Sequence, residues 1–267
     1  LRAMRFAIEG CLKGDGLANP QIAFADSLKR TFRDAETFRT LVRSREFQVH
    51  YQPIVHLDSR AVHHFEALTR FNGNAGPAEA IRMAEELDMI ESLDLAVAEK
   101  VLKRMRQPGA GLLKMAINVS GASLGNDTYV EQLLRMTAGA PEERRRLMIE
   151  VTETSAVADI QAADRRLAAL REAGIKICID DFGAGAAAFD YLRKLSVDAV
   201  KIDGAIVRDI ETDERSKAML HSIVELCRSM KLETIAEMIE TDGVAAEMKP
   251  AGVDYGQGWL FGRAEAE

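Results

Sequence analysis

Short apolar runs recur along the whole chain, and longer stretches with helical spacing separate most of them. Each run is bounded by polar or glycine residues, as β-strands usually are. Eight such runs are found, at residues 47–55, 62–69, 114–119, 147–151, 175–180, 199–202, 234–236 and 254–257. Helices are predicted between them, for example at residues 90–106, 158–173 and 213–229. This alternation predicts an α/β fold, a (β/α)8 barrel of the TIM type whose start is irregular because only a short link separates the first two strands.

Polar side chains stand where seven of the predicted strands end. In barrels of this kind the functional groups lie at the carboxyl ends of the strands and in the loops that follow. The residues are Glu66, Asn118, Glu150, Asp180 with Asp181, Lys201, Glu237 and Gln257. Any one of them could be an exposed loop residue, but as a ring they predict a functional site at one end of the barrel.

The adjacent pair Asp180 and Asp181 lies between an apolar run and a glycine turn at residues 182–185. Two neighbouring carboxylates repel each other unless a cation lies between them, so the pair indicates a metal ion. The alternative is a solvated turn or a helix cap. A pocket this acidic would also need metal ions to accept a phosphate group.

Composition narrows the class of protein. With 267 residues, 47% of them hydrophobic, the chain can bury a large core in one main domain. Its net charge is −7 and its basic residues are scattered, which argues against binding a DNA or RNA polymer. Three cysteines form no spaced framework, so the cytoplasm is the expected location. No apolar run is long enough to span a membrane.

Residues 1–37 are expected to form a separate N-terminal segment, and residues 38–267 are expected to form the barrel domain. An amphipathic helix is predicted at residues 32–47, leading into the first strand. The chain begins at Leu1 rather than methionine, so residues 1–25 are interpreted as the tail of an upstream module. Such a module would regulate the barrel in the full-length protein.

A series of motifs follows the same order as the predicted strands. It consists of YQPIV at 51–55, FEALTR at 65–70, INVS at 117–120, EVTE at 150–153, DDFG at 180–183, VKID at 200–203, IAE at 235–237 and QG at 257–258. The series resembles the EAL domain, a family of cyclic di-GMP phosphodiesterases and related receptors. The resemblance covers residues 38–263 approximately.

The resemblance implies a site with two divalent cations. A first ion would be ligated by Glu66, Asn118, Glu150 and Asp180. Asp180 would bridge to a second ion that also meets Asp181, and Gln257 would act as an outer ligand through water. Oxygen ligands of this kind suit Mg²⁺ or Mn²⁺, and no histidine or cysteine stands in the ring to favour zinc.

The implied reaction opens cyclic di-GMP to linear 5'-pGpG by attack of a metal-activated water. Lys201 would orient that water or offset charge on the phosphate, although a purely structural pairing with ring carboxylates is the alternative. Glu237 matches a family glutamate that acts as general base or as a water-mediated metal ligand. Glu153 matches a glutamate that supports the loop after Asp181.

Substrate contacts are also implied by the resemblance. Gln52, Leu68 and Arg70 match positions that hold the dinucleotide, the arginine through its forked donor and the leucine through packing. Phe261 is a candidate for stacking on a guanine, and core packing is the equally common alternative for such an aromatic.

The chain departs from the family pattern in two loops. Alanines occupy residue 184 and residues 186–188, where the family usually has threonine, tyrosine and serines, and Met238 replaces a glycine. The first loop is thought to couple dimer formation to metal binding, and a homodimer through residues 189–195 is expected. Two alternatives to the hydrolase stay open: an EAL-type receptor that binds cyclic di-GMP without cutting it, and a metal-dependent barrel that uses Lys201 as a base on a carbon acid.

Overall fold

The structure, a computed structural model, describes residues 4–5, 8, 20–71, 77–152, 159–183 and 188–266. The chain divides into two compact units. One consists of Leu1–Gln48 and Thr69–Val97, and the other of Val49–Leu68 and Ala98–Glu267. None of the described helices combines the length and the apolar character that a membrane crossing requires.

The first unit is helical. Its main elements are α2 (Pro20–Ser44), α3 (Pro77–Glu86) and the start of α4 (Ile90–Met105). The predicted helix at residues 32–47 exists, but α2 begins at Pro20 and ends at Ser44. Proline suits the first turn of a helix, and Arg45 ends the helix by adopting a left-handed conformation with φ 61°. Phe71 packs against Phe38 and Phe47, with ring centroids 5.6 and 6.3 Å apart.

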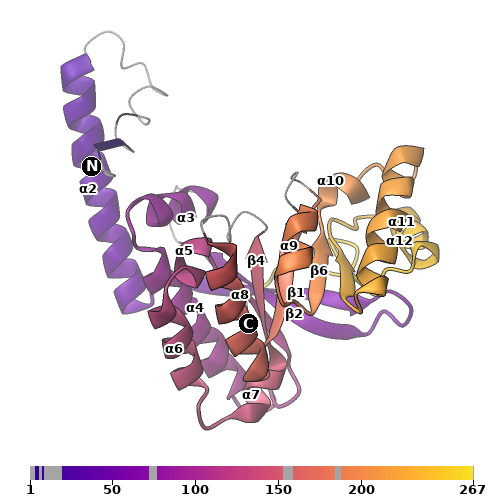
Figure 1. The fold of residues 1–267 in the computed structure, drawn as a ribbon. Helices are drawn as coiled ribbons and strands as arrows, with labels where there is room; N and C mark the ends of the chain where they lie inside the picture. Colours follow the sequence, from indigo (N-terminus) through magenta and orange to yellow (C-terminus); the bar gives the residue numbers. More distant parts are fainter. Residues whose placement is uncertain are drawn as a thin grey trace. The chain divides into compact units, whose positions relative to one another are not determined.

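The second unit contains a closed barrel of eight strands that follow one another in sequence order (Figure 1). The strands are β1 (Gln48–His56), β2 (Val62–Arg70), β3 (Met115–Asn118), β4 (Leu147–Thr152), β5 (Lys176–Phe182), β6 (Ala199–Ile202), β7 (Glu233–Ala236) and β8 (Tyr255–Gln257). All eight sequence-predicted strands are therefore confirmed, each within two residues of its expected bounds.

Strand β1 is the irregular strand. It pairs antiparallel with β8, with Ile54 opposite Gln257, whereas β2 to β8 pair in parallel. Only residues 57–61 link β1 to β2. A parallel crossover needs a dozen or more residues, so this short link forces the chain to reverse.

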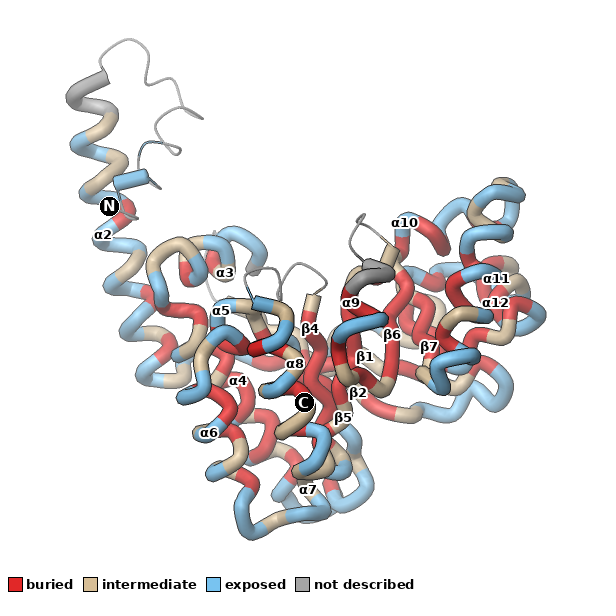
Figure 2. Tube along the Cα trace, in the orientation of Figure 1, coloured by how far each residue is buried: buried red, intermediate tan, exposed pale blue. Residues whose placement is uncertain are grey.

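Helices cover the outside of the strands. They are α5 (Gly121–Leu124), α6 (Asp127–Met136), α7 (Pro141–Arg146), α8 (Ile160–Glu172), α9 (Ala188–Lys194), α10 (Gly204–Val207), α11 (Glu214–Ser229) and α12 (Asp242–Ala251). Side chains cap several of their amino ends: Asp159 accepts from the amide of Ala162, and Thr241 from that of Val244. Figure 2 shows that the strands are buried and that the helices are exposed on their outer faces.

The barrel interior is filled by one layer of mostly apolar side chains. The layer consists of Ile54, Ala116, Met148, Cys178, Ala199, Ile235 and Tyr255, all at most 8% exposed. Each comes from a different strand. Because side chains alternate along a strand, the residue two positions away on each strand faces the same interior.

Candidate active site

The ring of polar residues lies next to this apolar layer. Counting two positions toward the carboxyl end from the layer gives Asn118, Glu150, Asp180, Lys201 and Gln257 on their strands and Glu237 directly after β7, and the same count from His64 gives Glu66 on β2. On β1, which runs in the opposite direction, Gln52 lies two positions before Ile54, and its Oε1 lies 3.3 Å from Gln257 Nε2. The strands therefore bring all these predicted site residues to one end of the barrel interior.

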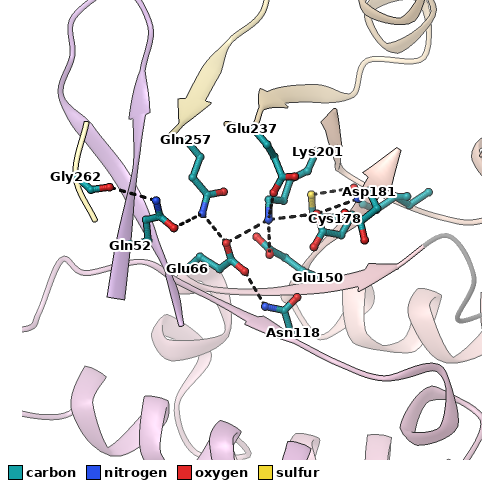
Figure 3. A network of polar contacts seen from close by, with 12 residues as sticks. Gln52, Glu66, Asn118, Glu150, Cys178, Asp181, Lys201, Glu237, Gln257 and Gly262 are labelled. Atoms are coloured by element: carbon teal, nitrogen blue, oxygen red, sulfur yellow. Dashed lines mark hydrogen bonds and ion pairs between the residues drawn. The ribbon is translucent and has the colours of Figure 1, made fainter. Parts of the chain in front are cut away.

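Lys201 lies at the centre of the ring and is only 1% exposed (Figure 3). Its Nζ atom is 2.8 Å from Glu237 Oε1, 3.1 Å from Glu150 Oε2 and 3.2 Å from both Glu66 Oε2 and Asp180 Oδ1. One buried ammonium is thus shared by four carboxylates. It cannot balance their full charge, so the site has an excess of negative charge when all four are ionised.

Amide side chains hold Glu66 from two sides. Asn118 Nδ2 donates to its Oε1 at 2.7 Å and Gln257 Nε2 donates to its Oε2 at 2.6 Å. Gln257 Nε2 also donates to Gln52 Oε1 at 3.3 Å, and Gln52 Nε2 donates to the carbonyl of Gly262 at 3.2 Å. Figure 3 shows this chain of amides running from the C-terminal segment to the ring.

Proton affinities follow from this crowding. Burial alone would raise the pKa of Glu66, but Lys201 and the two amide donors lower it below the usual range. Burial raises the pKa of Glu150 well above its usual range, because the attraction of Lys201 is offset by repulsion from Glu66 and Asp180. Burial likewise raises the pKa of Glu237 to about 7, against the pull of Lys201.

Lys201 stays charged despite its burial. Burial alone would lower its pKa, but the surrounding carboxylates, Glu150 foremost, raise it well above the ordinary value. The pKa of Asp181 is raised by burial and by repulsion from Asp180. The ring therefore favours either bound protons or bound cations.

The donor set fits divalent cations. Asp180, Asp181 and Glu237 each offer an oxygen, and these oxygens lie within 4.8 Å of one another. Two further oxygens, Glu150 Oε1 and Gln257 Oε1, are buried without a hydrogen-bond partner among the described residues. Buried polar atoms usually have partners, and carboxylate and amide oxygens are the preferred ligands of Mg²⁺ and Mn²⁺.

The remaining predicted residues do not all join the ring. Leu68 is half-buried on the same face of β2 as Glu66. Arg70 ends β2 and donates to the carbonyl of Thr69 at 3.0 Å, within the other compact unit. Glu153 lies outside the described residues, as do residues 184–187 of the altered loop.

Phe261 packs on the outside of the barrel. Gly256 lies between the inward-facing Tyr255 and Gln257, and a methyl group at Gly256 would meet the Phe261 ring at 2.9 Å. The guanidinium carbon of Arg60 lies 5.0 Å from the centre of this ring. Phe261 is half-buried against these residues, and its stacking on a guanine stays a prediction.

Comparison with known proteins identifies the family of this chain. The EAL domain family model matches residues 35–264. The chain belongs to the EAL domain family. This confirms the resemblance seen in the motif series, and the closed barrel confirms the (β/α)8 fold predicted from the alternation of strands and helices.

Several relatives of this EAL domain have names that describe an activity. The chain is 32% identical over 235 residues to the cyclic di-GMP phosphodiesterase NbdA of Pseudomonas aeruginosa, covering 85% of this chain and 30% of that protein. It is 31% identical to the cyclic di-GMP phosphodiesterase PdeB of Shewanella oneidensis, covering 84% of this chain and 27% of that protein. The chain therefore spans less than a third of the length of these two relatives.

Solved EAL structures have the same fold. The PaMucR phosphodiesterase in complex with c-di-GMP has a TM-score of 0.80 and 27% identity, covering 88% of this chain and 98% of that one. An EAL domain protein from Listeria monocytogenes has a TM-score of 0.77 and 26% identity, covering 85% and 92%.

The structure adds two features of the EAL site that the sequence reasoning missed. Gln52 occupies a ring position, and both ends of its amide are engaged within the protein. Met238 adopts φ 55° and its side chain lies against Gly204, with Arg208 Nη2 3.9 Å from its sulfur. The sequence signal that could have placed Gln52 in the ring is the short link after β1. The length of that link alone indicates that β1 is reversed.

Proposed function

We propose that this domain hydrolyses cyclic di-GMP to linear 5'-pGpG in a reaction that requires Mg²⁺ or Mn²⁺, two ions per site. The observation that carries the proposal is the crowding of four carboxylates around the single ammonium of Lys201. This arrangement favours the binding of cations. The names of the relatives and the c-di-GMP complex of a similar EAL structure support the choice of substrate.

The proposed ligands of the first ion are Glu66, Asn118, Glu150 and Asp180. Asp180 and Asp181 would hold the second ion, with Gln257 acting through water. Bound there, the two ions would supply polarisation of the phosphate and a lowered pKa of a water molecule. For Asn118 to serve as a ligand, its amide must present Oδ1 to the ion while Nδ2 keeps donating to Glu66.

The chain's own groups then handle the proton and the charge. Glu237 has a pKa of about 7, which suits a general base at neutral pH, so we assign it the proton of the attacking water. Lys201 lies 2.8 Å from Glu237 Oε1 and orients that carboxylate while offsetting charge that develops on the phosphate. Glu153 is proposed to support the loop after Asp181.

Leu68 and Arg70 are proposed as substrate contacts, by packing and by phosphate recognition respectively. Gln52 is better explained as a support for Gln257, since its amide already bonds within the protein.

We also propose a homodimer through the region of α9, an upstream regulatory domain in the full-length protein and a cytoplasmic location. Light scattering at several concentrations checks the dimer.

The test is hydrolysis of cyclic di-GMP by the purified chain, with products separated by chromatography. We expect linear 5'-pGpG with Mg²⁺ or Mn²⁺, none with excess EDTA, and at least a 100-fold loss, to order of magnitude, for Glu66→Gln. Glu214→Gln is the matched control, because Glu214 is exposed on α11.

The competing receptor function predicts a different result. Tight binding of cyclic di-GMP with no linear product, in monomer and dimer fractions alike, would favour a receptor over a hydrolase. Affinity for small carboxylic acids with none for cyclic dinucleotides would favour the carbon-acid alternative.

A further inference from the structure

A second polar cluster lies at the opposite end of the barrel from the ring. It surrounds a small cavity whose polar lining residues are His63, His64, Lys114, Arg145, Arg146 and Lys176. Lys114 directly precedes β3, Arg146 directly precedes β4, and Lys176 opens β5. The cavity therefore lies at the amino ends of these strands, whereas the proposed active site lies at their carboxyl ends.

A chain of three side chains fixes the proton positions on the two histidines. Lys114 Nζ lies 3.1 Å from His63 Nε2, and an ammonium can only donate, so this nitrogen of His63 is an acceptor. His63 then carries its proton on Nδ1, which lies 2.9 Å from His64 Nδ1. His64 Nδ1 must accept, so the proton of His64 is on Nε2.

That last nitrogen is a buried donor in need of an acceptor. His64 is only 2% exposed, and its Nε2 has no hydrogen-bond partner among the described residues. Leaving a buried N–H unpaired is costly, and native proteins rarely do so. An acceptor from outside the chain is the simplest partner for His64.

The charges of the side chains that line the cavity indicate which kind of acceptor would bind to His64. Lys176 pairs with Glu233 at 2.7 Å, and Arg145 pairs with Glu142. Of the other two cations, Arg146 donates to backbone carbonyls and Lys114 donates to His63. The lining has four cations and no carboxylate, which favours an anion.

We propose that this cavity binds a compact oxyanion of the phosphate type, held by Lys114 and Arg146 and accepting the Nε2 proton of His64. The cavity is small, about 30 Å³, which suits a compact inorganic ion. This site is separate from the proposed active site and does not depend on it.

Thermal unfolding in the presence of EDTA tests the proposal, because EDTA keeps metal ions away from the ring. Phosphate at about 10 mM should raise the melting temperature by about 3 °C more than sodium chloride of equal ionic strength. Lys114→Gln should abolish this difference. Lys103→Gln should retain it, because Lys103 is an exposed lysine of α4 that does not line the cavity.

Equal shifts in phosphate and chloride, or an unchanged phosphate response in Lys114→Gln, would overturn the proposal.

Nitrogen-15 NMR of the histidine rings provides a second measurement that does not depend on the variants. We expect His63 protonated on Nδ1 and His64 on Nε2, with the His64 Nε2 resonance moving on addition of phosphate. A His64 protonated on Nδ1, or a resonance indifferent to phosphate, would contradict the site.

Discussion

At the scale of single residues, Glu237 shows how the barrel interior controls ionisation. Burial raises its pKa to about 7 from an ordinary value of 4.5, although Lys201 lies 2.8 Å away. Repulsion from Asp180 adds to the effect of burial. The carboxyl group therefore changes its charge near neutral pH, where a general base is most effective.

This shift predicts a pH dependence of stability in the metal-free protein. Between pH 4.5 and about 7 the folded chain keeps a proton on Glu237 that the unfolded chain has lost. The free energy of unfolding then falls as the pH rises across this window, by up to about 3 kcal/mol for this group. Glu237→Gln should remove that part of the fall, measured by urea unfolding in EDTA at several pH values.

Glu214→Gln serves as the control, because the Glu214 side chain is exposed at the start of α11. If Glu237→Gln and the parent chain lose stability in parallel between pH 5 and pH 7, the pKa of Glu237 is not raised. Bound Mg²⁺ should oppose the effect, since a cation favours the ionised carboxylates, so its stabilisation should grow with pH.

The ring could be predicted from the sequence residue by residue because its members end apolar runs. Period-two alternation then places them on the face that the apolar layer occupies, as Glu150 and Met148 illustrate. The partners of each residue could not be predicted in this way. The sharing of Lys201 among four carboxylates and the relay from Lys114 to His64 depend on side-chain directions that one sequence does not contain.

At the scale of elements, the loop after β7 is fixed to the start of α10. Met238 adopts φ 55°, a conformation that costs a non-glycine residue about 1 kcal/mol. Its side chain fills the space over Gly204, where a methyl group would overlap it. The loop that carries Glu237 is thereby held against the start of α10, two residues beyond the end of β6.

This contact predicts a coupled pair of variants. Gly204→Ala should lower the free energy of unfolding by about 1–3 kcal/mol, because the new methyl group meets the Met238 side chain. In a Met238→Gly background the same substitution should cost much less, since the obstructing side chain is gone. Urea unfolding of both single variants and the double variant gives the coupling energy. Additive effects would show that the two residues do not touch.

Element bounds were predictable to different degrees for physical reasons. The strands were found within two residues because their apolar runs are short and sharply bounded. The sequence predicts a helix start at residue 32, whereas α2 begins at Pro20, because the residues between them lack a clear apolar face. The direction of β1 is determined by the length of the following link and not by its own residues.

At the scale of the whole molecule, closure of the barrel at β1 depends on the C-terminal residues as well as on β8. Tyr51 and Glu265 exchange two backbone hydrogen bonds, of 2.8 and 3.3 Å. His50 Nδ1 lies 3.3 Å from the carbonyl of Ala264. These contacts hold the first half of β1 against the C-terminal segment.

A chain that ends at Arg263 should therefore lose about 1–3 kcal/mol of unfolding free energy, the sum of two modest backbone hydrogen bonds. Denaturant unfolding monitored by circular dichroism measures the loss. A chain that ends at Ala266 keeps both bonds and should match the full chain. Equal stability of the two shortened chains would show that the bridge contributes nothing to closure.

The reversal of β1 also decides where the polypeptide enters the barrel. In a barrel of eight parallel strands the first strand begins at the end far from the functional residues. Here β1 begins at Gln48 on the rim that carries the ring, four residues before Gln52. A mechanical pull on the backbone ahead of Gln48 would act first on β1, the strand whose Gln52 amide accepts a hydrogen bond from Gln257 in the ring.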